Sequence, residues 1–264
     1  MNEATLQKEQ VDLLALAVPH FSAIGVDECK HYLRTENRGS IPDVLRTGFV
    51  LPSAIPLRAA PVEMVGYPIE ETDCLLWLDR MEQFAKDFFG KRIALRGAFP
   101  IPARLPWKNI LPIFDPGLTN REMVDKALSG NKLAVWEGTN VDRFSGASAL
   151  PAPRLYLIER APRPTEATMG LPPRFARNWF AGRQTRPLPL RTYGIGTSLW
   201  YKVEKKFLDP QTATFFTENT LPGGCVACGR YFSGSRLVYF GADGAGYERD
   251  EYGFREAIVL NLNT

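Results

Sequence analysis

The sequence predicts an α+β fold in which several helices and short strands are joined by long irregular connections. Three features lead to this prediction: segments with helical periodicity, short β-rich runs between them, and a high density of proline. Eighteen of the 21 prolines lie between Pro42 and Pro189. Because proline fixes φ and lacks an N–H donor, that part of the chain disfavours long helices and central strands.

Periodicity and capping residues locate the individual elements. The expected helices are Thr5–Val18, Asp27–Arg34, Thr72–Phe89, Thr119 to about Ser129, and Thr197–Phe207. Gly90 is a suitable end for the third helix, and Thr119 with Glu122 forms a capping box at the start of the fourth, which Gly130 closes. The expected strands are Lys91–Leu95, Lys132–Trp136, Arg154–Ile158, Leu237–Phe240 and Phe254–Leu262.

Length and composition are those of an ordinary globular protein. The chain has 264 residues, 45% hydrophobic and 23% charged, which fits one large domain or one domain with a smaller companion. A net charge of +3, with acids and bases interleaved, does not indicate a nucleic-acid partner. The chain begins without the pattern of a signal peptide and has no run of 18 apolar residues. We therefore expect no membrane insertion, and by default a cytoplasmic or virion-associated protein.

Two of the four cysteines, Cys225 and Cys228, form a lone C-x-x-C sequence. Structural zinc needs four ligands, and the only histidines, His20 and His31, are far away in the sequence. A redox pair is typically found at a helix N-terminus, whereas this pair lies in a strand-like, glycine-rich context. We expect neither a metal site nor a redox site here, and no cofactor.

The C-terminal part also lacks the residues of a hydrolytic or nucleotide-binding site. Glu248, Asp250 and Glu251 are close in sequence, but no histidine or G-x-S-x-G elbow accompanies them. Asp243 and Asp250 lack regular calcium-ligand spacing, and the glycines of 241–246 lack the G-K-[ST] ending of a phosphate loop. These absences favour a protein that is not an enzyme.

Residues 225–254 have an unusual composition. They contain seven aromatic residues and six glycines, and no Lys, Met, Trp or Gln. Antibody paratopes use a similar mixture, because tyrosine offers contact area with few torsions to freeze, while glycine and serine adapt. A plain aromatic β-hairpin core would account for the same composition equally well.

The order of several short motifs resembles known proteins. The stretches Thr220-Leu-Pro-Gly-Gly224 and Gly253-Phe-Arg-Glu-Ala-Ile258, with Gly229 and Ser235-Arg236 between them, resemble the end of a C-type-lectin domain. With Met169-Gly-Leu-Pro-Pro173 and Phe207-Leu-Asp-Pro210 upstream, the order resembles the variable proteins of diversity-generating retroelements. The resemblance implies a small, mostly antiparallel sheet with packed helices and long irregular loops.

The resemblance also implies a domain organisation. It covers roughly residues 131–264, which would form the C-type-lectin-like domain, with a variable ligand-binding segment at 225–252. Residues 1–130 would be an N-terminal helical and proline-rich region, either separate or an accessory part of the same fold.

In that family a reverse transcriptase rewrites adenine-templated codons while a frame stays fixed. Such codons do not encode Lys, Met, Trp or Gln, in agreement with residues 225–254, although Glu248 and Glu251 depart from the pattern. The implied frame is Gly223, Gly224, Gly229, Ser235, Arg236, Gly253, Phe254 and Arg255, with buried hydrogen bonds from Arg236 and Arg255. The implied ligand-binding residues are Cys225, Cys228, Arg230, Tyr231, Phe232, Leu237, Tyr239, Ala242, Asp243, Tyr247, Arg249, Asp250 and Tyr252.

The resemblance therefore predicts recognition of an unidentified protein or surface ligand, without catalysis. Two alternatives stay open. The first is an enzyme of the formylglycine-generating type, which shares the fold and would use Cys225 or Cys228 as a reactive cysteine. Serine at both positions would abolish that activity and leave binding nearly intact. The second is a structural component of a virion or surface assembly.

Overall fold

The structure is a computed structural model that describes residues 66–148, 152–235 and 237–262. The chain divides into two units, Met1–Val62 and Glu63–Thr264, and every described residue belongs to the second. The helices expected at Thr5–Val18 and Asp27–Arg34 lie outside the described residues. Among the described helices, none has the length and apolar character needed to cross a membrane.

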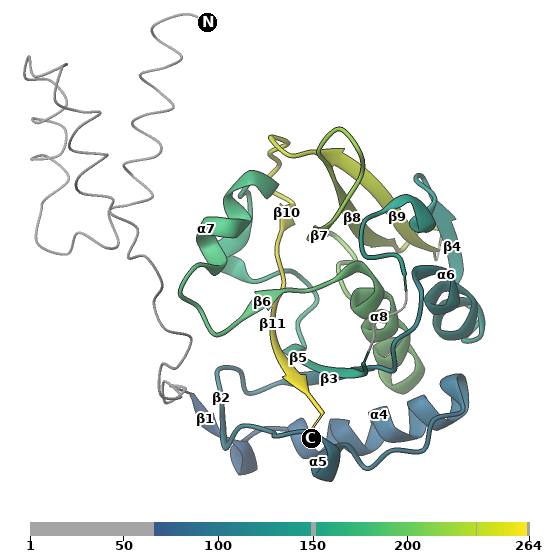
Figure 1. The fold of residues 1–264 in the computed structure, drawn as a ribbon, viewed down its shortest axis with the longest axis vertical. Coiled ribbons are helices and arrows are strands. Elements are labelled where there is room, and N and C mark those ends of the chain that lie inside the picture. Colours follow the sequence, from purple (N-terminus) through teal and green to yellow (C-terminus); the bar gives the residue numbers. More distant parts are fainter. Residues whose placement is uncertain (1–65, 149–151, 236, 263–264) are drawn as a thin grey trace, which may run out of the picture. The chain divides into compact units, whose positions relative to one another are not determined.

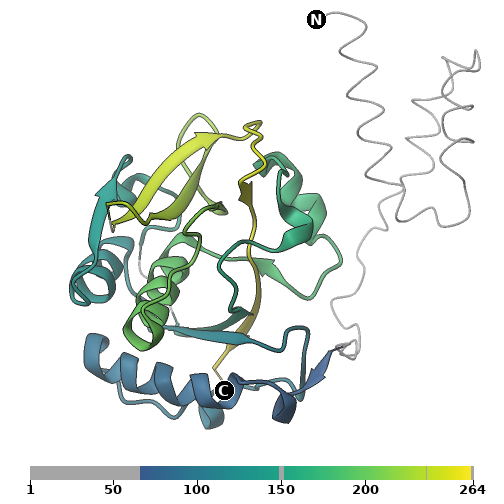
Figure 2. The same ribbon diagram turned by 180° about the vertical axis from the view of Figure 1, so that it is seen from behind.

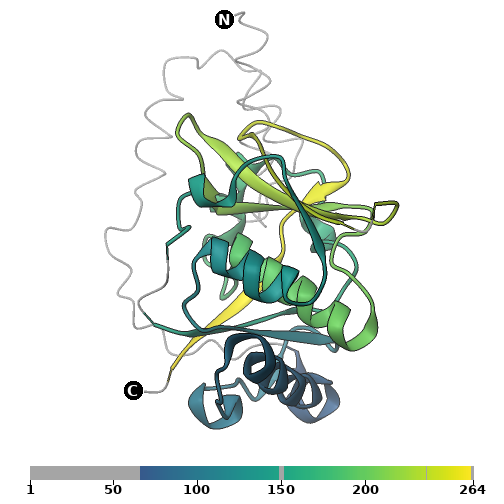
Figure 3. The same ribbon diagram turned by 90° about the vertical axis from the view of Figure 1, so that its right-hand side faces the viewer.

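A four-stranded antiparallel sheet lies at the centre of the described unit (Figure 1). Its strands, in spatial order, are β3 Ile110–Asp115, β5 Arg154–Glu159, β11 Glu256–Asn261 and β6 Arg186–Pro187. All six residues of β3 are buried, because helix α4 (Cys74–Phe89) covers one side of the strand and α8 (Leu190–Glu204) the other (Figure 3). This two-sided burial explains why β3 reads as an apolar run rather than an alternating one.

Because β3 pairs with β5 beside the last strand, residues 66–130 are part of the same fold. Glu63–Thr264 form one compact unit, with no division at 130/131.

A second sheet of five strands packs on the far side of α8 (Figure 2). Its spatial order is β10 Tyr252–Gly253, β7 Ala213–Thr220, β8 Cys225–Phe232, β9 Leu237–Gly244 and β4 Ala134–Glu137. Strands β7, β8 and β9 form an antiparallel meander, and β4 and β10 add in parallel at its two edges. The α+β class is therefore confirmed, but the described residues form two substantial sheets rather than one, with a two-stranded ribbon of β1 Tyr67–Pro68 and β2 Arg104–Leu105.

Two of the expected helices have their predicted ends. Helix α4 ends at Gly90 in the left-handed conformation, with φ of 65°. At the other helix, Thr119 accepts a hydrogen bond from the Glu122 amide while Glu122 accepts one from the Thr119 amide, so the capping box is present. That helix begins as α6 Asn120–Glu122 and continues as a π-helical segment, η3 Met123–Ser129.

Two local predictions are wrong. Residues 91–94 are irregular rather than a strand and lead into α5 Leu95–Ala98, where the Glu82 carboxylate accepts a hydrogen bond from the Leu95 amide. Helix α8 begins at Leu190, seven residues before the expected Thr197, and ends at Glu204. Its first turns contain Gly194 and Gly196, which disfavour helix in isolation.

Close packing explains those two glycines. A Cβ on Gly194 would lie 2.1 Å from the Met123 sulfur, and a Cβ on Gly196 would lie 2.6 Å from Cδ1 of Ile113. The helix is thus pressed between η3 and β3. All residues from Leu190 to Trp200 are buried, so this half of the helix has no polar stripe from which periodicity could be read.

The shorter elements connect this framework. They are α7 Ala176–Phe180 and the 3₁₀ turns η2 Ile69–Glu71, η4 Val141–Arg143, η5 Glu166–Thr168 and η6 Pro173–Phe175.

The predicted buried bond of Arg255 is confirmed: its Nη2 donates to Oδ1 of the buried Asp209 at 2.5 Å. Arg236 lies outside the described residues.

Candidate ligand-binding face

The two faces of the five-stranded sheet have different surroundings. Pairing of Tyr231 with Val238 and of Gly229 with Phe240 places these residues on the side of α8, where Tyr193 packs against Phe240. Successive residues of a strand point to opposite sides, so their neighbours point away from α8. We call that second side the outer face. It is formed by Trp136, Cys228, Arg230, Phe232, Leu237, Tyr239, Asp243 and Tyr252.

An aromatic cluster occupies the open end of the outer face. The Trp136 ring centroid lies 5.0 Å from that of Tyr239 and 6.3 Å from that of Phe232, and the Tyr239 and Phe232 centroids are 5.7 Å apart. Cζ of Arg230 lies 4.6 Å from the Phe232 centroid, as in a cation–π contact. Trp136 is 54% exposed, so the cluster presents a large apolar surface to solvent.

The sequence does not reveal that Trp136 belongs to this cluster. It stands in the segment expected to be a strand, but only the parallel pairing of β4 with β9 brings it opposite Tyr239. The available signal was the tryptophan in a short β-rich run, which carries no information about its partner strand.

The Tyr239 ring is held in a fixed position by two glycines. A Cβ on Gly241 would lie 2.0 Å from the Tyr239 hydroxyl oxygen, and a Cβ on Gly138 would lie 2.7 Å from its Cε2. The missing side chains let the ring lie against the backbone of both positions. An aromatic side chain fixed before binding loses little further conformational freedom when a ligand arrives.

The other end of the outer face is covered by a second, smaller core. Ala176 and Phe180 of α7 pack with Phe215, Val226 and Tyr252, and Tyr252 is only 7% exposed. Tyr247 packs edge-on against Tyr252, and Arg249 lies over the Tyr247 ring. The exposed part of the outer face is therefore the end that holds the aromatic cluster, and the loop between β9 and β10 contributes the exposed Arg249.

Cys225 and Cys228 do not form a functional pair. They are three positions apart on β8, so they point to opposite sides of the sheet. Cys228 is buried, and its Sγ lies 3.3 Å from a carboxylate oxygen of Asp243. Burial first, and then the Asp243 charge, raise the pKa of the Cys228 thiol. No group of His, Cys, Asp or Glu within the described ranges has the geometry of a metal site.

The two thiols should differ in reactivity. Because a raised pKa lowers the thiolate fraction, we expect iodoacetamide to alkylate the half-buried Cys225 well before Cys228 at about pH 8. Asp243→Asn removes a charge that raises the Cys228 pKa, so Cys228 labelling should accelerate, by about tenfold per pKa unit recovered. Fragment-ion mass spectrometry after a short pulse measures both rates. Equal rates in the folded protein, as expected in urea, would contradict this account.

Ten of the thirteen implied binding residues lie on the outer face or in the adjoining loop. The outer face holds Cys228, Arg230, Phe232, Leu237, Tyr239, Asp243 and Tyr252, and the loop between β9 and β10 holds Tyr247, Arg249 and Asp250. Of these, Cys228 and Tyr252 are buried within the second core.

Three implied binding residues point the other way. Tyr231 is 5% exposed, and its ring stacks on Phe207 with centroids 3.4 Å apart, so its assignment to an exposed surface is wrong. Cys225 and Ala242 share its side of the sheet. The composition of a segment does not fix which residues face solvent, since a shift by one residue exchanges the two faces.

The implied frame residues have structural reasons to stay constant. Gly223 and Gly224 adopt φ of 94° and 84° in the turn between β7 and β8, which side chains rarely adopt. A Cβ on Gly229 would lie 2.9 Å from the Phe216 ring, and a Cβ on Gly253 would lie 3.0 Å from the Met169 sulfur. Substitution at these four positions would therefore strain the backbone or displace the core.

Comparison of the chain with protein-family models, with curated proteins and with solved structures finds no match.

Proposed function

We propose that this chain is a non-catalytic recognition protein that binds a protein ligand through its outer face. One observation carries the proposal. On the same two strands, the residues that could be exchanged point to solvent, and the residues that pack tightly point into the core. Arg230 and Tyr239 face solvent, while their neighbours Gly229 and Phe240 are buried against the core. Such an arrangement lets the exposed surface change without disturbing the fold.

The proposed scaffold is the C-type lectin fold, as in the variable proteins of diversity-generating retroelements. The Gly253-Phe-Arg-Glu-Ala motif supports this assignment, because it joins the edge strand β10 to the central strand β11. Within the motif, Phe254 is fully buried and Arg255 is paired with Asp209. These are the properties expected of a fixed frame next to a changing surface.

The side chains of the outer face favour a protein as the ligand. Trp, Tyr and Arg are enriched among residues that dominate protein–protein binding energy, where they bury large areas and leave few torsions to order. Trp136, Tyr239 and Arg230 provide all three within one cluster. A large exposed apolar surface of this kind is uncommon on a protein that binds nothing there.

The cysteine geometry favours recognition over the enzyme alternative. A formylglycine-generating-type enzyme would need a reactive cysteine in a cleft. Burial and the nearby carboxylate instead hold Cys228 in its thiol form, and Cys225 lies on the opposite side of the sheet. Cys228 therefore does not offer the stabilised thiolate that nucleophilic chemistry requires.

Sequencing the DNA around the gene tests the retroelement origin. We expect a near-copy of the part that encodes residues 225–252, close to a reverse-transcriptase gene and differing mainly at adenines. Differences should affect outward codons such as those of Arg230, Phe232 and Tyr239, and spare inward codons such as those of Gly229 and Phe240.

The position of the differences decides the outcome. The proposed origin is wrong if no such copy exists, or if the differences fall equally on inward and outward codons. Recognition through the outer face does not depend on this genomic result, because it rests on the contacts of the face itself.

A further inference from the structure

A pocket of about 340 Å³ opens beside the four-stranded sheet, and none of its lining residues belongs to the outer face. Pairing of Arg154 with Asn261 and of Tyr156 with Val259 places these four residues on one side of the sheet. Gln184, Arg186, Pro187 and Glu218 complete the lining. The volume lies at the lower end of the range of small-molecule sites, which is about 300–1,000 Å³.

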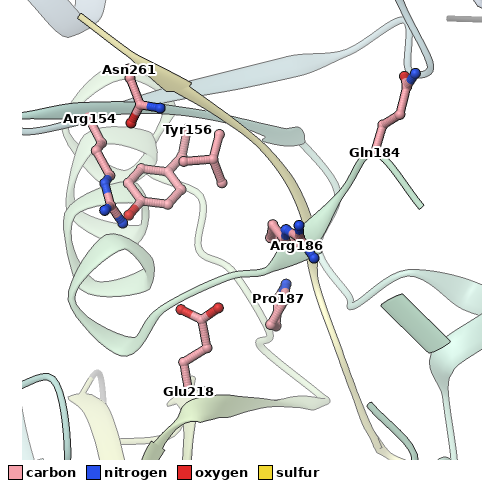
Figure 4. Close-up of a pocket in the computed structure, with 8 residues that line it drawn as sticks. Arg154, Tyr156, Gln184, Arg186, Pro187, Glu218 and Asn261 are labelled. Atoms are coloured by element: carbon pink, nitrogen blue, oxygen red, sulfur yellow. The ribbon is translucent and has the colours of Figure 1, made fainter. Parts of the chain in front are cut away.

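The charged groups of this pocket form no salt bridge with any other residue that the structure describes. Arg154 is half-buried, and most other buried or half-buried arginines among the described residues take part in salt bridges, whereas Arg186 and Glu218 are exposed. Against the larger effect of burial, the Arg154 guanidinium lowers the pKa of the Tyr156 hydroxyl. In Figure 4 the Glu218 carboxylate points from β7 toward the Arg154 guanidinium and the Tyr156 hydroxyl. Two cations and one anion thus face a common space.

A bulge in β7 directs Glu218 into the pocket. The pairing of β7 with β8 shifts between Phe216 and Thr220, so Glu218 lies in a stretch that leaves the ladder. The bulge is fixed on both sides: the Ser145 hydroxyl donates to the Glu218 carbonyl, and Asn219 accepts a hydrogen bond from the first amide of α8. Bulges commonly re-aim a side chain beside a functional site.

Desolvation raises the pKa values of two groups that line the pocket. It raises the pKa of Glu218, an effect that the charges of Arg154 and Arg186 oppose. It also raises the pKa of the Tyr156 hydroxyl, which therefore stays a neutral hydrogen-bond donor. A carboxylate near two guanidinium groups that form no salt bridge with another described residue favours a ligand with both an anionic group and a donor.

We propose that this pocket binds a small organic carboxylate that also carries hydroxyl or ammonium donors. The ligand carboxylate would lie between the guanidinium groups of Arg154 and Arg186, and its donor would be held by Glu218. Charge-assisted bonds of this kind are roughly twice as strong as neutral ones, and the arginine fork matches carboxylate geometry. The site is independent of the recognition proposed for the outer face.

Isothermal titration of the full chain tests the proposal with three carboxylate probes: D-glucuronate, L-malate and L-serine. At least one should bind saturably at concentrations up to about 10 mM. For glucuronate, two matched ligands separate the contributions. Glucose lacks the carboxylate and cyclohexanecarboxylate lacks the hydroxyls, and each should bind about tenfold more weakly.

Variants of the pocket residues test which of them contact the ligand. Arg186→Gln, at an exposed residue whose loss should not unfold the protein, should weaken binding of the carboxylate probe by about tenfold. Glu218→Gln should remove the preference for glucuronate over cyclohexanecarboxylate. Arg92→Gln makes the same charge change at an exposed residue outside the pocket and should leave binding unchanged.

Several results would overturn the proposal. These are the absence of saturable binding by all three probes, equal weakening by Arg92→Gln and Arg186→Gln, or binding of inorganic phosphate in preference to every carboxylate. A loss of preference in Glu218→Gln with the carboxylate affinity retained supports the assigned orientation.

Discussion

Replacing Arg255 by leucine should lower the free energy of unfolding by about 3–5 kcal/mol, the usual cost of leaving one member of a buried ion pair alone. Arg255 is 3% exposed and Asp209 is fully buried, with the guanidinium 2.5 Å from the carboxylate. Asp209 also accepts a hydrogen bond from Thr214 at 2.6 Å, which fixes the start of β7. Chemical unfolding followed by circular dichroism measures the loss.

A matched surface variant shows whether burial is the cause. Arg249 lies 3.5 Å from Glu251, and both side chains are largely exposed. Arg249→Leu should therefore change stability far less than Arg255→Leu does. If Arg255→Leu cost no more than this control, the buried pair would not stabilise the fold.

A double variant separates the buried charge from lost packing. Asp209 has φ of 51°, a left-handed conformation that asparagine tolerates, so Asp209→Asn removes the charge without new backbone strain. Combined with Arg255→Leu, it should be more stable than Arg255→Leu alone, because no unpaired charge remains buried. Packing loss alone predicts the opposite order, with the double variant the less stable of the two.

Features that depend on a few neighbouring residues could be predicted from the sequence. The capping box needs only Thr119 and Glu122, and the end of α4 needs only a residue that accepts the left-handed conformation of Gly90. The buried hydrogen bond of Arg255 was also predicted correctly, through the motif around it. Each of these signals is contained in a short stretch of sequence.

Features set by contacts between distant segments could not be predicted. The beginning of α8 depends on Met123 and Ile113, which accept the two helix glycines at close range. Trp136 joins the outer face only because β4 pairs with β9, and Glu218 enters the pocket only because of the bulge in β7. The same limit applies to Tyr231, since composition identifies an aromatic strand but not the side on which each ring lies.

Two matched libraries should give very different yields of folded protein. One randomises the outward pairs Arg230–Tyr239 and Phe232–Leu237, and the other randomises the adjacent inward pairs Gly229–Phe240 and Tyr231–Val238. Both change four positions on the same two strands, with the same codons. We expect most outward clones to resist protease in a surface-display assay, and almost no inward clones to do so.

The expected difference follows from burial. Changes at half-exposed positions typically cost less than about 1 kcal/mol each, whereas emptying or overfilling a core position costs about 1–4 kcal/mol. Four inward changes together approach the whole stability of a domain, which is about 5–15 kcal/mol. Gly229 is especially restrictive, because any side chain there meets the Phe216 ring.

The comparison also separates a surface suited to variation from an ordinary aromatic hairpin. In a hairpin whose outward rings are essential to packing, both libraries would lose folded clones to a similar extent. In a recognition protein the outward rings contribute to ligand contact more than to stability, so their loss would leave folding intact while changing what is bound. Similar survival in the two libraries would therefore remove the physical basis for assigning ligand binding to the outer face.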